Sequence, residues 1–254
     1  MMRVIKVGGR AQDDSRLAPA IAAAWKAAPA GLCLVHGGGD GISALQRALG
    51  VEPSFALGRR VTGERDIEAV RMALSGTANK LLVARLVSAG VSALGISGED
   101  AGLIVARAVS PGTLGRVGTP ERIEVRLLWH LLDGGYLPVI SPLSRDIDTP
   151  ECGALNVNGD DAAAAIAVAL GASELLFVAD VAGVMANGEV VSSLAPDDAA
   201  AMIERGVATG GMAAKLQAAA TALDGGVECV RIGDMEAILD PSLGTALVPS
   251  RSFA

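Results

Sequence analysis

Aromatic residues are scarce in this chain: Phe, Trp and Tyr together make up 2% of its 254 residues. Hydrophobic residues nevertheless account for 51%, and 46 residues are alanine, so the core has to be built from Ala, Val, Leu and Ile. A chain of this length buries roughly 70–75% of its unfolded surface. The composition therefore excludes a disordered protein and predicts a full hydrophobic core.

Cysteine is also rare, and the three residues form no Cys-x-x-Cys pair: Cys33, Cys152 and Cys229. An odd, scattered set argues against a disulfide framework or a zinc site and indicates a reducing cytoplasm. The longest unbroken apolar run, 162–172, is far shorter than the roughly 20 residues of a membrane helix. The charged N-terminus does not resemble a secretory signal. We therefore expect a cytoplasmic protein with no membrane partner.

Positive charge is in short supply, and the net charge of −7 argues against a nucleic-acid partner. Lysine is the scarcer basic residue, with four copies against 17 arginines. Two of the four lie in glycine-rich segments: Lys6 precedes one Gly-Gly pair and Lys215 follows another. Either lysine alone could be a surface residue beside a turn. Together they indicate a phosphoryl-transfer site, where compact ammonium groups lie beside exposed backbone N–H groups.

Short β-branched runs alternate with longer Ala- and Leu-rich amphipathic segments, and glycines separate them. The pattern predicts strands at 4–7, 32–35, 93–96, 137–140, 175–178 and 228–232. It predicts helices at 15–28, 41–49, 65–89, 125–134, 161–170, 196–205 and 213–224. The segments 110–122 and 141–159 are interpreted as loops, the first of them hairpin-like. Apolar strands separated by helices favour a parallel sheet covered on both faces.

Glycines follow the predicted strands directly, as in Gly8-Gly9 and in the triple glycine after His36. Ligands of such sheets bind at the carboxyl ends of the strands, where glycines let an anion approach the backbone. A tight turn is the simpler alternative, and His36 is better explained as a semi-buried histidine than as a base. The Walker and dinucleotide-binding glycine patterns are absent, which disfavours a Walker-type NTPase and a simple Rossmann dehydrogenase.

Polar residues cluster just before the predicted helix at 161–170. Asn156, Asn158 and Asp160 stand at alternate positions and could point together into a site, where Asp160 would hold ammonium groups. Asp160 or Asp161 could instead cap the helix. The segment Arg59-Arg60-Val61-Thr62 offers a forked donor suited to a carboxylate, although a single exposed arginine is ordinarily a surface residue.

Nine short segments in register along nearly the whole chain resemble the acetylglutamate kinases of the amino-acid kinase superfamily. They are 6–9, 35–39, 58–62, 76–80, 96–100, 138–142, 156–160, 179–184 and 210–215. The resemblance implies a three-layer α/β/α sandwich with a mostly parallel central sheet. It also implies two lobes: an acyl-amino-acid-binding and dimerisation lobe at 1–172 and an ATP-binding lobe at 173–254.

The implied activity is the ATP-dependent phosphorylation of the γ-carboxylate of N-acetyl-L-glutamate in arginine biosynthesis, with ATP and Mg²⁺ and no metal site of the protein's own. By position, Lys6 and Lys215 correspond to the lysines that stabilise the transferring phosphoryl group, and Asp160 to the aspartate that orients them. The implied acyl-amino-acid contacts are Gly38, Gly39, Arg60 and Asn156. The implied nucleotide contacts are Gly8, Gly9, Asp180, Val181, Ala182, Gly183, Val184, Met185, Val207, Ala208 and Thr209.

The residue types agree with this chemistry. A carboxylate nucleophile is already ionised at pH 7, so it needs no general base. The absence of an activated Ser, Cys or His is therefore expected. Positioned cations and backbone N–H groups are what the reaction of an anion with a polyphosphate requires.

Three features depart from the family pattern. Glu99 stands where a lysine is frequent, and we assign it no role. The segment 232–245 looks shorter than usual. The chain begins at its first strand, without the extra helix of arginine-inhibited hexamers, so we expect a homodimer without arginine feedback.

Two alternatives stay open at this point. One is a kinase for another acyl-amino acid, such as N-succinylglutamate or carrier-bound aminoadipate. The other is a non-catalytic ATP-binding regulatory module, which should have lost Lys6, Lys215 or Asp160.

Overall fold

The structure, a computed structural model, describes residues 1–56, 59–151, 153–186 and 188–248. Cys152 and the first residue of the 58–62 segment lie outside these ranges. The described part contains an 11-stranded sheet in the order β13-β15-β14-β10-β1-β2-β8-β6-β7-β9, with β5 beside β8. Its central strands pair in parallel, and they are β14 (Cys229–Gly233), β10 (Glu174–Val178), β1 (Arg3–Val7), β2 (Leu32–His36) and β8 (Leu137–Asp146).

Helices cover both faces of this sheet. On one face lie α6 (Val125–Asp133), α7 (Gly159–Ala169) and α9 (Gly210–Asp224), and on the other α1 (Leu17–Ala27) and α4 (Asn79–Ser88). Successive residues of a strand point to opposite faces, so Val4 packs into one core cluster and Ile5 into the other. The predicted three-layer α/β/α fold with a mostly parallel sheet is confirmed.

The first predicted loop contains a true hairpin. Strands β6 (Ile104–Ala108) and β7 (Val117–Ile123) pair antiparallel, and the short helix α5 (Pro111–Leu114) lies in their connection. The second predicted loop, 141–159, is wrong. Strand β8 continues to Asp146, and β9 (Ala154–Val157) pairs antiparallel with it. Turn-forming residues are tolerated here because their hydroxyls are bonded internally, as Ser141 is to Ser75 at 2.7 Å.

The predicted helix at 65–89 is continuous but not uniform. A π-helical segment, η2 (Arg71–Ala78), separates α3 (Asp66–Val70) from α4. Such segments are frequent at functional sites. Arg71 at its start forms a two-pronged ion pair with Glu99, with contacts of 3.0 and 2.9 Å. Glu99, to which we assigned no role, therefore ties the turn after β5 (Ala93–Gly98) to this helix.

Smaller elements complete the chain. They are η1 (Arg10–Asp13), α2 (Gly39–Ala48), β3 (Phe55–Ala56), β4 (Arg59–Arg60), η3 (Asp100–Gly102), β11 (Met185–Ala186), β12 (Glu189–Val190), β13 (Ser193–Leu194), α8 (Pro196–Glu204), η4 (Glu236–Ile238) and β15 (Thr245–Leu247). No helix of the described residues is long and apolar enough to cross a bilayer.

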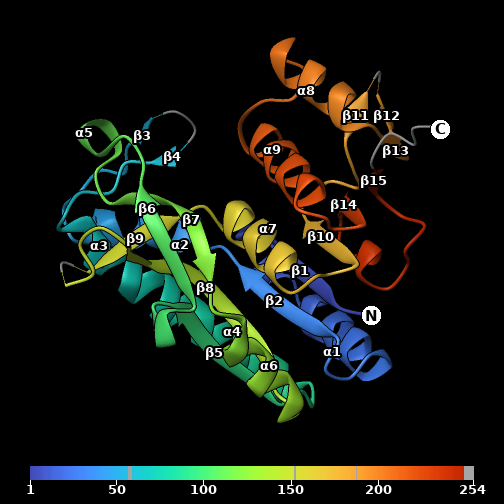
Figure 1. Cartoon of the computed structure of the whole chain (residues 1–254), viewed down its shortest axis with the longest axis horizontal. Helices are drawn as coiled ribbons and strands as arrows, with labels where there is room; N and C mark the ends of the chain where they lie inside the picture. The colour runs from blue at the N-terminus through green and yellow to red at the C-terminus, as the bar shows by residue number, and fades with distance from the viewer. Residues whose placement is uncertain (57–58, 152, 187, 249–254) are drawn as a thin grey trace.

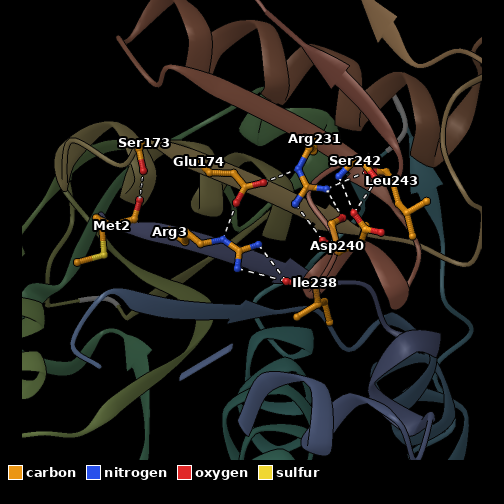
Figure 2. A network of polar contacts seen from close by, with 10 residues as sticks. Met2, Arg3, Ser173, Glu174, Arg231, Ile238, Asp240, Ser242 and Leu243 are labelled. Carbon is orange, nitrogen blue, oxygen red and sulfur yellow. Dashed lines mark hydrogen bonds and ion pairs between the residues drawn. The ribbon is translucent and has the colours of Figure 1, made fainter. Parts of the chain in front are cut away.

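The segment before β15, which we expect from the sequence to be shorter than usual, is anchored by one buried arginine. Arg231 donates to the carbonyl oxygens of Ala237, Asp240 and Leu243 at 2.9, 3.2 and 2.9 Å. Its guanidinium also pairs with Glu174, which Arg3 contacts from the other side (Figure 2). The network joins the beginnings of β1 and β10 to the C-terminal part of the chain.

The sheet runs without interruption across the expected lobe boundary at residue 172, because β1 pairs with both β2 and β10. Figure 1 shows the green segments on one side of α7 and the orange to red segments on the other. The two-lobe division stays a prediction. Helix α7 lies between the two groups of segments.

Candidate active site

A buried carboxylate at the start of α7 lies between the two lysines of the glycine-rich segments. Lys6 Nζ, on β1, is 2.7 Å from Oδ1 of Asp160, and Lys215 Nζ, on α9, is 3.2 Å from Oδ2. The helix cap is Asn158, whose side-chain oxygen accepts the backbone N–H of Asp160 at 2.8 Å. The capping role thus falls to Asn158, and the Asp160 carboxylate faces both ammonium groups.

Burial and charge determine the protonation of this centre. Asp160 is 4% exposed, and burial alone would raise the pKa of its carboxyl group. The charges and hydrogen bonds of the two lysines outweigh that effect, so the pKa of Asp160 lies below its ordinary value. Burial, together with the charge of Lys6, lowers the pKa of Lys215, and Asp160 opposes this only in part. Two cations around one anion leave a net positive centre that attracts an incoming anion.

A cavity of about 240 Å³ lies on the Lys6 side of the centre. All four residues predicted to contact the acyl-amino acid line it together with Lys6 and Asp160, namely Gly38, Gly39, Arg60 and Asn156. A Cβ on Gly38 would lie 2.8 Å from Cδ1 of Leu74, so this position has no room for a side chain. The glycine run therefore presents its backbone to the cavity, which we name the acyl cavity.

Arg60 is held firmly at this cavity and is 8% exposed. One terminal nitrogen donates to Gln46 Oε1 at 2.6 Å. The other donates to the Gly39 carbonyl at 2.9 Å and to Ser43 Oγ at 2.8 Å. The guanidinium also stacks on the Phe55 ring, 4.9 Å from its centroid. The reading of Arg60 as a surface residue is therefore wrong.

The glycine run rests on a buried polar chain. The Gly37 carbonyl accepts from Gln12 Nε2 at 2.7 Å and lies 2.8 Å from His36 Nδ1. His36 Nε2 is 3.0 Å from Asn79 Nδ2. Burial lowers the pKa of His36 to about 4, so the ring is neutral at pH 7 and supports the loop without acting as a base.

A second cavity of about 400 Å³ lies on the Lys215 side, and we name it the nucleotide-side cavity. Of the residues predicted to contact nucleotide, four line it: Gly8, Gly9, Asp180 and Val181. The others, 182–185 and 207–209, are not part of its lining. Val184 and Ala208 are buried, whereas Met185 and Val207 are exposed. Val184 N–H donates to Thr245 Oγ1 at 2.8 Å, which ties this loop to β15.

Several residues of the site were missed from the sequence. Gln12 and Asn79 support the glycine run, and Phe55 stacks on Arg60. Arg59, which belongs to the predicted forked-donor segment, also lines the acyl cavity. Asn79 stands inside one of the nine matching segments, which was the only available signal for it. Gln12 bonds Gly37, which is distant in sequence, so no local pattern indicates it. Phe55 and Arg60 come together because β3 pairs with β4.

Comparisons with known proteins show the family of this chain. The sequence profile of the amino acid kinase family matches residues 1–234. An acetylglutamate kinase from Roseiflexus sp. (strain RS-1) is 43% identical over 98% of this chain and 94% of its own length. One from Rubrobacter xylanophilus is 45% identical over 88% and 85%.

Solved structures show the same arrangement of elements. The protein smu.665 from Streptococcus mutans UA159 superposes with a TM-score of 0.87 at 31% identity, over 97% of this chain and 98% of that chain. Carbamate kinase from Giardia lamblia bound to AMP-PNP superposes with a TM-score of 0.71 at 16% identity, over 98% of each chain, and shares the fold.

The fold and the Lys-Asp-Lys centre define a phosphotransferase of the kinase type, and the chain belongs to the amino acid kinase family. The relatives that match nearly its full length are acetylglutamate kinases, so the resemblance found in the sequence is confirmed.

Proposed function

We propose that this enzyme transfers the γ-phosphoryl group of ATP to the γ-carboxylate of N-acetyl-L-glutamate, giving the acyl phosphate and ADP in arginine biosynthesis. The observation that carries the proposal is the position of Asp160. It bonds one lysine that lines the acyl cavity and another that lines the nucleotide-side cavity. The acetylglutamate kinases similar over nearly the full chain support the choice of substrate.

The reaction forms one bond and breaks one. An oxygen of the γ-carboxylate attacks the γ-phosphorus, and the bond to the bridging oxygen of ADP breaks. The nucleophile is ionised at neutral pH, so no proton has to be removed. The barrier is the approach of two anions, which Lys6 and Lys215 lower by stabilising the charge on the transferring group.

We assign a role in this phosphoryl transfer to the remaining predicted residues. Asp160 holds both lysines at fixed positions. Arg60 and Asn156 bind the acyl-amino acid, and the backbone of Gly38 and Gly39 approaches it closely. Gly8, Gly9, Asp180 and Val181, which line the nucleotide-side cavity, contact the nucleotide. The contacts of 182–185 and 207–209 stay a prediction.

Mg²⁺ is proposed as the companion of ATP. The described residues contain no group of three or more His, Cys, Asp or Glu side chains that could hold a metal ion. In kinases Mg²⁺ is usually bound mainly by substrate phosphates and water. The ion would neutralise phosphate charge, and the protein's own contribution is the pair of lysines.

The acyl cavity favours a small substrate over a carrier-bound one. Its volume of about 240 Å³ is modest, since ligand pockets commonly measure roughly 300–1,000 Å³. A non-catalytic module is disfavoured because Lys6, Asp160 and Lys215 are present and in contact.

We also propose a homodimer, formed along β5 and α4. Among the described strands, β5 pairs with β8 alone, which leaves its other edge open. Leu81 and Val87 on α4 are each 54% exposed, and Leu94 on β5 is 38% exposed. A second copy would cover these apolar side chains, and light scattering measures the assembly. The cytoplasmic location expected from the sequence stays a prediction.

The substrate is tested by measuring ADP release with ATP and a panel of N-acylated acidic amino acids. N-Acetyl-L-glutamate should give the highest kcat/KM, and N-acetyl-L-aspartate, one methylene shorter, should react poorly. A clear preference for N-succinylglutamate or for a carrier-bound acid would mean that this compound, and not N-acetylglutamate, is the substrate. No ADP release above background with any acceptor would contradict catalysis altogether.

A further inference from the structure

Arg59 lies next to Arg60 but has a different partner. Its Nη2 is 2.7 Å from Oδ2 of Asp161, and the two side chains are 27% and 22% exposed. Asp161 directly follows Asp160 in the first turn of α7. The ion pair therefore joins β4, which carries Arg60, to the helix that carries the central carboxylate.

The side chain of Arg60 ties β4 to α2, and the ion pair of Arg59 adds a contact to α7. Strand β4 has two residues and pairs with the two-residue β3 in the described sheets. A hairpin of this size is marginally stable by itself. Nη1 of Arg59 is buried without a hydrogen-bond partner among the described residues, so Asp161 is the anion on which this guanidinium depends. Loss of that carboxylate would leave a mostly buried cation uncompensated, which is a costly arrangement.

We propose that Arg59 and Asp161 are positioning residues that fix β4 against α7 and so hold Arg60 and Phe55 at the acyl cavity. This inference rests on the proposed function, because it assigns their effect to the acyl-amino acid. Breaking the ion pair should raise KM for N-acetylglutamate by roughly 3–10-fold, in the range of a partly exposed ion pair. KM for ATP and kcat should stay within twofold of the wild type.

Direct binding of substrate by Arg59 is the competing explanation, because Arg59 lines the acyl cavity. Asp161 is not part of that lining, so the variant Asp161→Asn distinguishes the positioning role from direct binding. Under the positioning role, this variant raises KM for N-acetylglutamate. Under direct binding, a guanidinium freed from its partner would bind the substrate at least as well, and KM would not rise.

The kinetic test uses Arg59→Leu, Asp161→Asn, the double variant and Arg59→Lys. The double variant should be no worse than the poorer single one, because both remove the same interaction. Arg59→Lys keeps the charge and should regain most of the affinity. Arg107→Leu, which removes a more exposed arginine paired with Glu121 and Asp148, is the control and should leave all constants unchanged. Wild-type KM in Asp161→Asn, or equal increases in both KM values, would overturn the proposal.

A second readout does not depend on activity. Trypsin cleaves after arginine, and Asp161→Asn should speed cleavage after Arg59 and Arg60 specifically, as mass spectrometry of early fragments would show. Unchanged cleavage there, or acceleration at all arginines alike, would contradict a local positioning role. If the wild-type enzyme fails to phosphorylate N-acetylglutamate, the proposed function is wrong, and the trypsin result still decides whether the ion pair holds β4.

Discussion

The two cavities beside Asp160 are built in different ways. At the acyl cavity, Arg60 makes three hydrogen bonds to Gln46, Gly39 and Ser43, and Asn156 donates to Thr62 Oγ1 at 3.0 Å. At the nucleotide-side cavity, the loops after β1 and β10 form much of the wall, and Val181 is 37% exposed.

This difference has a functional consequence. Side chains locked in place before binding lose little entropy when the ligand arrives, so each contact contributes specificity. We therefore expect single substitutions at the acyl cavity to affect one substrate strongly. At the nucleotide-side cavity, whose wall is largely backbone and exposed loops, the effects should be spread over many positions. Substitutions in the centre between the cavities, at Lys6, Asp160 or Lys215, should affect the chemical step alone and therefore lower kcat.

The largest effect should come from the lysines that join the two cavities. Lys6→Ala and Lys215→Ala should each lower kcat by about 10²–10³, because each removes one preorganised charge from the transition state. Lys26→Ala, at an exposed position on α1, is the matched control. Steady-state kinetics on folded protein, verified by circular dichroism, measures this. Normal turnover in either site variant would refute the assignment of the centre.

Asp160→Asn should come next, with kcat lower by roughly 10–100-fold and both KM values within a few-fold. The lysines lose their shared anion while the two cavities keep their walls. Asp161→Asn is the neighbouring control and should leave kcat intact. A thermal melt run beside the kinetics decides between catalysis and stability: a lower Tm with full kcat would make Asp160 a structural residue.

Arg60→Ala should raise KM for N-acetylglutamate by roughly 10–100-fold, the loss of a charge-assisted pair of hydrogen bonds. KM for ATP should hardly change, because the nucleotide is assigned to the other cavity. Initial rates at varied concentrations of each substrate measure the split. An increase confined to ATP would mean that the two cavities have been assigned in reverse.

The smallest expected effect is on the pH dependence of stability, and it comes from His36, which supports the glycine run. The pKa of His36 lies near 4 in the folded chain, below its ordinary value of 6.5. The unfolded chain therefore binds a proton more readily, and stability is lost as pH falls through 6.5, until the loss levels off below about 4. Denaturant unfolding should show roughly 1–1.5 kcal/mol less stability at pH 5.5 than at pH 7.5 from this group.

His36→Gln should remove that pH dependence, whereas His130→Gln, in the other histidine, should keep it. If the free energy of unfolding changed equally with pH in the wild type and in His36→Gln, the ring would not be buried in its neutral form.

The strands and the Lys-Asp-Lys centre could be predicted from the sequence because nearby residues of distinctive type mark them. Val4–Val7 and the strands beside it are apolar and β-branched, and glycines mark their ends, so both their positions and the edge that carries the site could be derived. Lys6 and Lys215 stood out because lysine is rare elsewhere in the chain.

Other features depend on partners that are distant in sequence. The extension of β8 was missed because Ser141, Pro142 and Ser144 look like turn residues. Ser141 and Ser144 belong to the strand because they pair with β5, and Ser144 also pairs with β9. The hydrogen bonds of Arg60 to Gln46 and Ser43 depend on where α2 packs, which no local pattern specifies. The same holds for Arg59 and Asp161, an ion pair between residues that are far apart in the sequence.

The central claim is that Asp160 and its two lysines transfer a phosphoryl group from one cavity to a carboxylate in the other. Trapping the product with hydroxylamine tests this most directly, because an acyl phosphate gives a hydroxamate that can be counted against ADP. We expect equal amounts of hydroxamate and ADP when the wild-type enzyme reacts with ATP and N-acetylglutamate. ADP without hydroxamate would mean that the phosphoryl group goes to water, and would contradict the central claim.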